Sequence, residues 1–166
     1  GTLRIGDTLT DGEELNFIGV PYFAPEILRR VRLNDAMKAK KLRQALGELA
    51  EEGVVQLFRP QDGSAPLVGV VGTLQLDVLQ ARLAGEYGIA IGFETPPYAL
   101  ARWIGADDKA ALARFVAANR GSMADDVDGD PVFLASSAFM MRRAEEHAPE
   151  VRFRDIKDVR AAALAA

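Results

Sequence analysis

A group of basic side chains stands out in a chain whose formal net charge is -4. Its six members fall within thirteen consecutive residues: Arg29, Arg30, Arg32, Lys38, Lys40 and Lys41. Arginine and lysine donate hydrogen bonds to phosphate oxygens, and such contacts position a protein on RNA without reading its bases. The simpler interpretations are a solvated charged face, or ion pairs with Glu48, Glu51 and Glu52. We take the six residues as a candidate contact to RNA, a local patch on a chain too acidic to be coated in basic charge.

Other motifs that carry chemistry are missing from the sequence. It contains no GxxxxGK[ST] loop, so this segment has no P-loop for a nucleoside triphosphate. With a single histidine, His147, and no cysteine, neither a zinc site nor a disulfide is expected. Four aspartates share the loop 125–130, but the downstream glutamate of an EF-hand is absent, and we interpret the loop as solvated. We predict no catalytic residue, no bound cofactor and no metal in this segment.

Composition limits the class of protein. Apolar residues make up 49% of the 166 residues, enough for a real core. No apolar run approaches the ~20 residues that span a bilayer, so no membrane contact is expected. The lack of cysteine makes the cytoplasm the simplest compartment. The first residue is Gly1 and no signal-peptide pattern follows, so the chain looks like a piece of a longer one.

The basic residues need a scaffold, and residues 26–98 predict one. Alternation in 27–33 predicts a strand with Arg29 on one face and Arg30 and Arg32 on the other. The remaining periodicities predict a helix at 35–52, strands near 54–58 and 67–71 around a turn at 61–64, a helix at 73–87 and a strand near 89–93. This β-α-β-β-α-β order is ferredoxin-like: an α+β fold with four antiparallel strands and both helices on one face.

Residues at the helix ends refine this prediction. Asn34 or Asp35 can cap the first helix, and Thr73 is the expected cap of the second. Gly88 ends the second helix, because glycine readily adopts the left-handed conformation. Leu79 belongs to the buried stripe of that helix, so we expect it in the core.

The pattern repeats in shorter form after Pro96-Pro97 and predicts a smaller α/β subdomain. The expected elements are a strand at 101–104, a helix capped by Asp107, a polar loop at 119–130, a strand at 132–135, a helix capped by Ser136 or Ser137, and a strand at 151–153. We divide the chain into 1–20, the end of a preceding β-barrel domain or a linker; 21–98, the ferredoxin-like domain; 99–160, the smaller subdomain; and 161–166, a tail.

Several segments resemble one family. Pro21–Glu26 (PYFAPE), Arg29–Arg32 (RRVR) and Gly72–Val78 (GTLQLDV) are similar to bacterial peptide chain release factor 3, a family of translational GTPases. Gln75 stands where elongation factor relatives carry a histidine, and Ala50–Gly53 (AEEG) is similar to the Ser-Glu-Glu-Gly of that family. The opening 5–9 (IGDTL) looks like the end of the barrel domain. The resemblance covers essentially the whole chain and weakens after about residue 107.

The resemblance implies a function for the parent protein. It would be a GTP-dependent factor that removes stop-codon-reading release factors from the ribosome. GTP and magnesium would bind an N-terminal domain, and this C-terminal segment would contact the ribosome and the parent's own GTPase and barrel domains as a non-catalytic part of a cytoplasmic monomer. Alternatives are the C-terminal part of another translational GTPase such as an elongation factor, a small ferredoxin-like enzyme, or a ligand-binding domain, since one scaffold hosts many functions.

Overall fold

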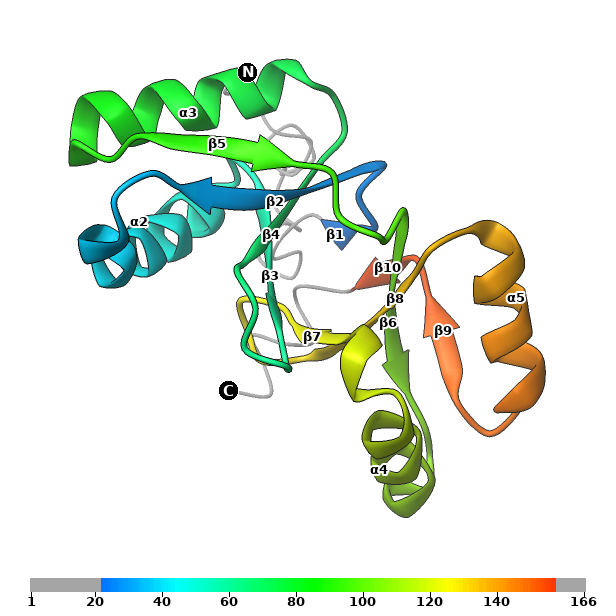
Figure 1. Cartoon of the computed structure of the whole chain (residues 1–166). Helices are drawn as coiled ribbons and strands as arrows, with labels where there is room; N and C mark the ends of the chain where they lie inside the picture. The colour runs from blue at the N-terminus through cyan, green and yellow to red at the C-terminus, as the bar shows by residue number, and fades with distance from the viewer. Residues whose placement is uncertain (1–21, 158–166) are drawn as a thin grey trace, which may run out of the picture.

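The computed structural model describes residues 22–157 (Figure 1). The expected barrel end or linker at 1–20 and the expected tail at 161–166 lie outside the described residues. Within them, the chain forms an eight-stranded sheet and a separate two-stranded sheet. None of the helices in this part of the chain is long and apolar enough to cross a membrane.

The first part of the chain has the predicted β-α-β-β-α-β order. Its elements are β2 (Ile27–Leu33), α2 (Ala39–Glu51), β3 (Gln56–Pro60), β4 (Leu67–Val70), α3 (Leu74–Tyr87) and β5 (Ile91–Glu94). The strands lie in the order β5-β2-β4-β3 and every neighbouring pair is antiparallel. The ferredoxin-like prediction is therefore confirmed, and we call these residues the first unit.

Both helices of the first unit cover the same face of the sheet. Leu46 and Leu49 of α2 and Leu79 and Leu83 of α3 are fully buried in one core with Val31, Val68 and Val70 of the strands. Apolar side chains recurring every three or four residues give each helix one such stripe, and the sheet buries both stripes together.

The start of α2 agrees with the sequence, whereas the start of α3 does not. Asp35 accepts a hydrogen bond from the Met37 N–H and opens a 3₁₀ turn (Ala36–Lys38) that leads into α2. Thr73, the expected cap of α3, makes no capping hydrogen bond. Gln75 of the first turn instead holds the segment before the helix, because its Oε1 accepts from the N–H groups of Val71 (2.8 Å) and Gly72 (3.2 Å).

The second part of the chain repeats the same order. Its elements are β6 (Leu100–Gly105), α4 (Lys109–Ala118), β7 (Met123–Asp125), β8 (Pro131–Ala135), α5 (Ala138–His147) and β9 (Arg152–Arg154). The strand order β7-β8-β6-β9 mirrors that of the first unit, again with antiparallel neighbours. The registers also correspond: Arg29 pairs with Val68, and at the equivalent place Arg102 pairs with Phe133. The expected smaller α/β subdomain is thus a second ferredoxin-like unit.

Two local expectations in the second unit were wrong. The polar loop predicted at 119–130 contains β7, a strand of three residues between β3 and β8. A strand this short has no periodicity to detect, and pairing on both sides creates it. The cap of α4 is Asp108, which accepts from the Ala110 N–H, because Asp107 instead forms an ion pair with Arg152. Ser137 caps α5, one of the two serines expected there.

The two units join edge to edge and then fold against each other. Arg59 of β3 pairs with Asp125 of β7, which makes the sheet continuous. The helix-free faces of the units share a second core that contains Phe58 of the first unit and Trp103 of the second. Near this core lie β1 (Tyr22–Phe23) and β10 (Ile156–Lys157), which pair antiparallel between the units (Figure 1).

Candidate nucleic-acid interface

The predicted alternation in β2 holds and divides the three arginines. Val31 and Leu33 contact the helix-covered core, so Arg29 shares their face, whereas Leu28 belongs to the helix-free core, on the side of Arg30 and Arg32. Arg29 Nη1 donates to the Leu28 carbonyl oxygen at 2.8 Å. The structure therefore separates Arg29 from the other two arginines by the thickness of the sheet.

Arg30 and Arg32 are held at one end of the first unit. Arg30 Nη1 donates to the Ala65 carbonyl oxygen (2.9 Å) in the loop between β3 and β4. Arg32 lies over Gly92 of β5, where a Cβ atom would collide with its Nη2. Gly92 thus provides the room for the Arg32 side chain to cross the neighbouring strand.

The three lysines lie at the same end, around the start of α2. Lys40 and Lys41 are exposed, and α2 has no acidic residue in its first turn. Lys38 Nζ donates to the Gly88 carbonyl oxygen (2.6 Å), at the residue where α3 ends. A cation at a helix C-terminus is favourable, so α3 stabilises the charge of Lys38, whereas the N-terminus of α2 disfavours Lys40 and Lys41.

Two further arginines belong to this end and were not among the predicted residues. Arg43 of α2 and Arg59 of β3 line one side of a shallow cavity of about 190 Å³ beside Ser64 of the β3–β4 loop. The Arg59 guanidinium lies beside Gly47, one helical turn after Arg43. The spacing of Lys40 and Arg43 on one helix was a detectable signal, but Arg59 arrives through strand pairing and had none. We call Arg30, Arg32, Lys38, Lys40, Lys41, Arg43 and Arg59 the basic end.

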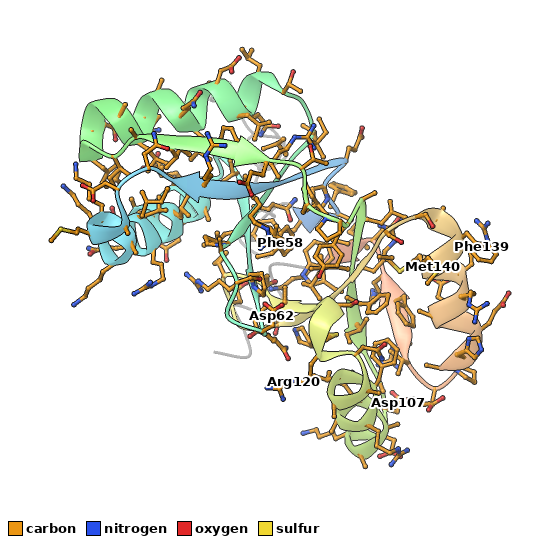
Figure 2. All side chains as sticks on the ribbon, in the orientation of Figure 1. Phe58, Asp62, Asp107, Arg120, Phe139 and Met140 are labelled. Atoms are coloured by element: carbon orange, nitrogen blue, oxygen red, sulfur yellow. The ribbon has the colours of Figure 1, made fainter. Side chains whose placement is uncertain are left out.

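Two carboxylates near the basic end, Asp62 and Asp35, accept hydrogen bonds from backbone or hydroxyl donors. Asp62 accepts from both the hydroxyl (2.6 Å) and the N–H (3.0 Å) of Ser64, and Figure 2 shows it at the tip of the β3–β4 hairpin. These hydrogen bonds lower the pKa of the Asp62 carboxyl, and Arg30 lowers it further by a smaller amount. Asp35 accepts from Met37. Within residues 22–157, no side chain of the basic end forms an ion pair. The suggested pairs with glutamates of α2 are therefore not formed there.

We predicted that the aspartate loop is solvated, and this prediction is wrong. Its carboxylates surround the Lys157 ammonium, with Nζ at 2.8 Å from Asp126, 2.7 Å from Asp128 and 2.6 Å from Asp130. Asp126 is only 5% exposed, and its Oδ2 also accepts from the Trp103 indole N–H at 3.0 Å. We call Lys157 and the three aspartates the lysine clasp. The residue that explains the loop lies far along the chain, so local spacing could not reveal it.

Within residues 22–157, the three aspartates of the clasp are the one group of carboxylates whose oxygens lie as close together as metal ligands do. The Lys157 ammonium occupies the centre of this group. His147 does not join it. That side chain is exposed on α5, with Nδ1 2.9 Å from the Arg143 carbonyl oxygen, one turn earlier in the helix.

Comparison with known protein families agrees with this architecture. The family model described as class II release factor RF3, C-terminal domain, matches residues 17–145. The match begins before β1, covers the first unit and most of the second, and ends within α5. It includes the segments that carried the resemblance from Tyr22 onward, and with them the whole basic end. The chain therefore belongs to the family of the C-terminal domain of class II release factor RF3, a peptide chain release factor of translation termination.

Proposed function

We propose that the basic end contacts ribosomal RNA when the full-length factor binds the ribosome. In that role the domain serves a parent that promotes GTP-dependent dissociation of stop-codon-reading release factors. One observation carries the proposal: α2, β2, β3 and the turn before α2 place seven cations at one end of the first unit. Arg30 and Arg32 lie on the helix-free face of the sheet and the other five on the side that the helices cover, and none forms an ion pair in residues 22–157. Glu94 lies opposite Arg30 and Asp125 opposite Arg59 in the strand register, but neither forms an ion pair with it. Cations gathered at one end and free of ion pairs are suited to the phosphates of an RNA backbone.

The arrangement has a cost that stability alone does not explain. Lys40 and Lys41 lie in the first turn of α2, at the positive end of the helix dipole, which is unfavourable by a few tenths of a kcal/mol to about 1 kcal/mol each at low salt. Two arginines, Arg43 and Arg59, crowd against one cavity and repel each other. A bound phosphate would relieve both effects, because it neutralises the cations and interacts favourably with the helix N-terminus.

The rest of the parent follows from the family and from what this segment lacks. GTP and magnesium would bind an N-terminal domain, since the segment has no P-loop. The partners of this domain would be the ribosome and the parent's own GTPase and barrel domains, in a cytoplasmic monomer. The family match is to a release factor, so the elongation factor alternative has no support. Nor do the described residues show convergent catalytic groups that would favour a small enzyme.

The proposal predicts salt-dependent loss of ribosome binding. The full-length factor that carries Arg30→Ala, Arg32→Ala and Lys41→Ala should bind ribosomes more weakly than the unsubstituted full-length factor. Each lost phosphate contact should reduce the slope of log affinity against log salt by roughly one unit or less. The measurement is binding to purified ribosomes across a salt series. Adding Arg43→Ala and Arg59→Ala should reduce the slope again.

A matched triple variant in the second unit is the control. Lys109→Ala, Arg120→Ala and Arg142→Ala remove the same charge from exposed positions outside the basic end. This control variant should keep the slope of log affinity against log salt that the unsubstituted full-length factor has. If the two triple variants behave alike, or if neither changes affinity and slope, the basic end is a solvated face and the proposal is wrong.

A further inference from the structure

The two units differ in how closely their two helices pack against each other. In the first unit, Tyr87 of α3 donates to Glu48 of α2 at 2.8 Å, and Arg82 bonds Glu52 at the end of α2, so the helices close over the core. In the second unit a cavity of about 630 Å³ lies between α4 and α5. Its wall residues come from both helices, and its floor includes Phe133 of β8. We call this cavity the α4–α5 groove.

The buried residues of the helices explain the difference. α2 buries Leu42, Ala45, Leu46, Leu49 and Ala50, whereas α4 fully buries only Ala111 and α5 only Met141. Large side chains fill the space between the helices in the first unit. In the second unit the helices line the same space with small side chains: Ala111 and Ala118 of α4, and Ala144 and Ala148 of α5. Small residues on facing walls let another helix approach closely.

The groove combines apolar surface with positive charge. Arg114 stands on the α4 wall and Arg143 on the α5 wall, both exposed and, within residues 22–157, without an ion pair. Glu150 is the one carboxylate among the lining residues. Met140, 44% exposed, lies on the inner side of α5 at this groove, whereas Phe139 lies on the outer side (Figure 2). Methionine adapts its shape to different apolar partners, so it suits a binding surface.

We propose that the α4–α5 groove binds an acidic amphipathic helix of a partner protein. The apolar stripe of such a helix would lie on the alanine walls and Met140, and its flanking carboxylates would meet Arg114 and Arg143. This is the helix-in-groove mode of recognition, with apolar anchors at helical spacing. RNA fits less well, because its phosphates make no favourable contact with the apolar walls, and the lining offers little exposed aromatic surface on which bases could stack. The proposal is independent of the basic end, which lies on the first unit.

A designed peptide tests the proposal on the 166-residue chain. The probe is about 16 residues long, roughly four helical turns, with leucine at helical spacing and glutamate on both flanks. One control peptide carries lysine in place of glutamate, and another has the leucines scrambled. Binding is followed by NMR through the methyl groups of Met140, Ala118 and Ala144. We expect the glutamate peptide to shift these signals, and both control peptides to leave them unchanged.

Variants of the chain make the test specific. Arg114→Glu with Arg143→Glu should weaken binding about tenfold or more, because like charges then face each other. Arg142→Glu, next to Arg143 but outside the groove, should leave affinity unchanged. Ala118→Phe should block the groove without changing charge, and Ala117→Phe serves as its control. All five substituted positions are exposed, and a melting curve for each variant verifies folding.

Several outcomes would overturn the proposal. They are no shift with the glutamate peptide, equal binding of the lysine or scrambled peptide, or equal binding by the charge-reversed and parent chains. A short single-stranded RNA that displaced the peptide would make the groove a nucleic-acid site instead. Self-association of the chain that shifts the same methyl groups would make the occupant a second copy.

Discussion

Lys157 is the residue that joins the end of the described chain to its beginning and to the second unit. Its ammonium is surrounded by Asp126, Asp128 and Asp130, and it lies 5.9 Å from the centre of the Tyr22 ring. The side chain of Lys157 is 9% exposed and that of Asp126 is 7% exposed, so water offers little compensation if either charge loses its partner.

Lys157→Met should therefore destabilise the fold. The variant leaves the buried Asp126 carboxylate without its cation, and we expect the free energy of unfolding to fall by about 3 kcal/mol. Asp128 and Asp130 remain partly exposed, which keeps the loss at the lower end for a broken buried pair. Urea unfolding measures it, with exposed Arg154→Met as control. A loss no larger than that of the control would mean the clasp contributes no stability.

The clasp should also keep its contribution at alkaline pH. Burial lowers the pKa of Lys157, but hydrogen bonds to the three aspartates outweigh burial and raise the pKa above its ordinary value. A raised pKa means that the stabilisation is complete below the unfolded pKa of about 10.4, and is lost as pH rises through the folded pKa. The stability difference between the parent chain and Lys157→Met should thus stay constant from neutral pH to about pH 10.

At the scale of the elements, the residues that fix the starts of the helices were predicted least well from the sequence. Thr73 matched the residue type of a cap, yet Gln75 accepts the two N–H groups before α3 and donates its Nε2 to the Val54 carbonyl oxygen at 3.2 Å. Gln75 therefore joins α3 to the segment that leads into β3. The glutamine used to separate this family from elongation factors has a structural role here.

This assignment predicts unequal effects of two neighbouring substitutions. Gln75→Ala should cost about 1–2 kcal/mol of unfolding free energy, because it leaves the N–H groups of Val71 and Gly72 and the Val54 carbonyl oxygen without their partner. Thr73→Ala, at a position that makes no capping hydrogen bond, should cost about 0.5 kcal/mol or less. Thermal or urea unfolding of both variants ranks the two positions. A larger loss for Thr73→Ala than for Gln75→Ala would contradict the role given to Gln75.

Prediction from sequence succeeded where one element carried its own signal. The strand at 27–33, the buried stripes of α2 and α3 and the ending of α3 at Gly88 all follow from local periodicity or local backbone preference. It failed where a partner far along the chain creates the structure. β7 exists through pairing with β3 and β8, and Arg59 reaches the basic end by strand register alone.

At the scale of the whole molecule, two helix-covered cores flank a third core between the units. The core of the first unit depends on α3, whose Leu79 is 0% exposed. Leu79→Ala should lower the free energy of unfolding by about 2–5 kcal/mol, from lost burial and the cavity left behind.

A neighbour on the same helix provides the control for this substitution. Val78 is 43% exposed, so Val78→Ala should change stability by about 0.5 kcal/mol. Equal losses for the two variants would contradict the packing described for the first unit.

The pairing of β1 with β10 has a mechanical consequence. Tyr22 pairs with Lys157 and Phe23 with Ile156, so both ends of the described chain leave this ladder on the same side. Tension between them peels the ladder open one bond after another, instead of loading its bonds together in shear. Lys157 sits where peeling begins, and its carboxylate contacts take the load first. A pulling force would thus open the clasp first, while both helix-covered cores stayed folded, and the rest of the domain would unfold only at higher force.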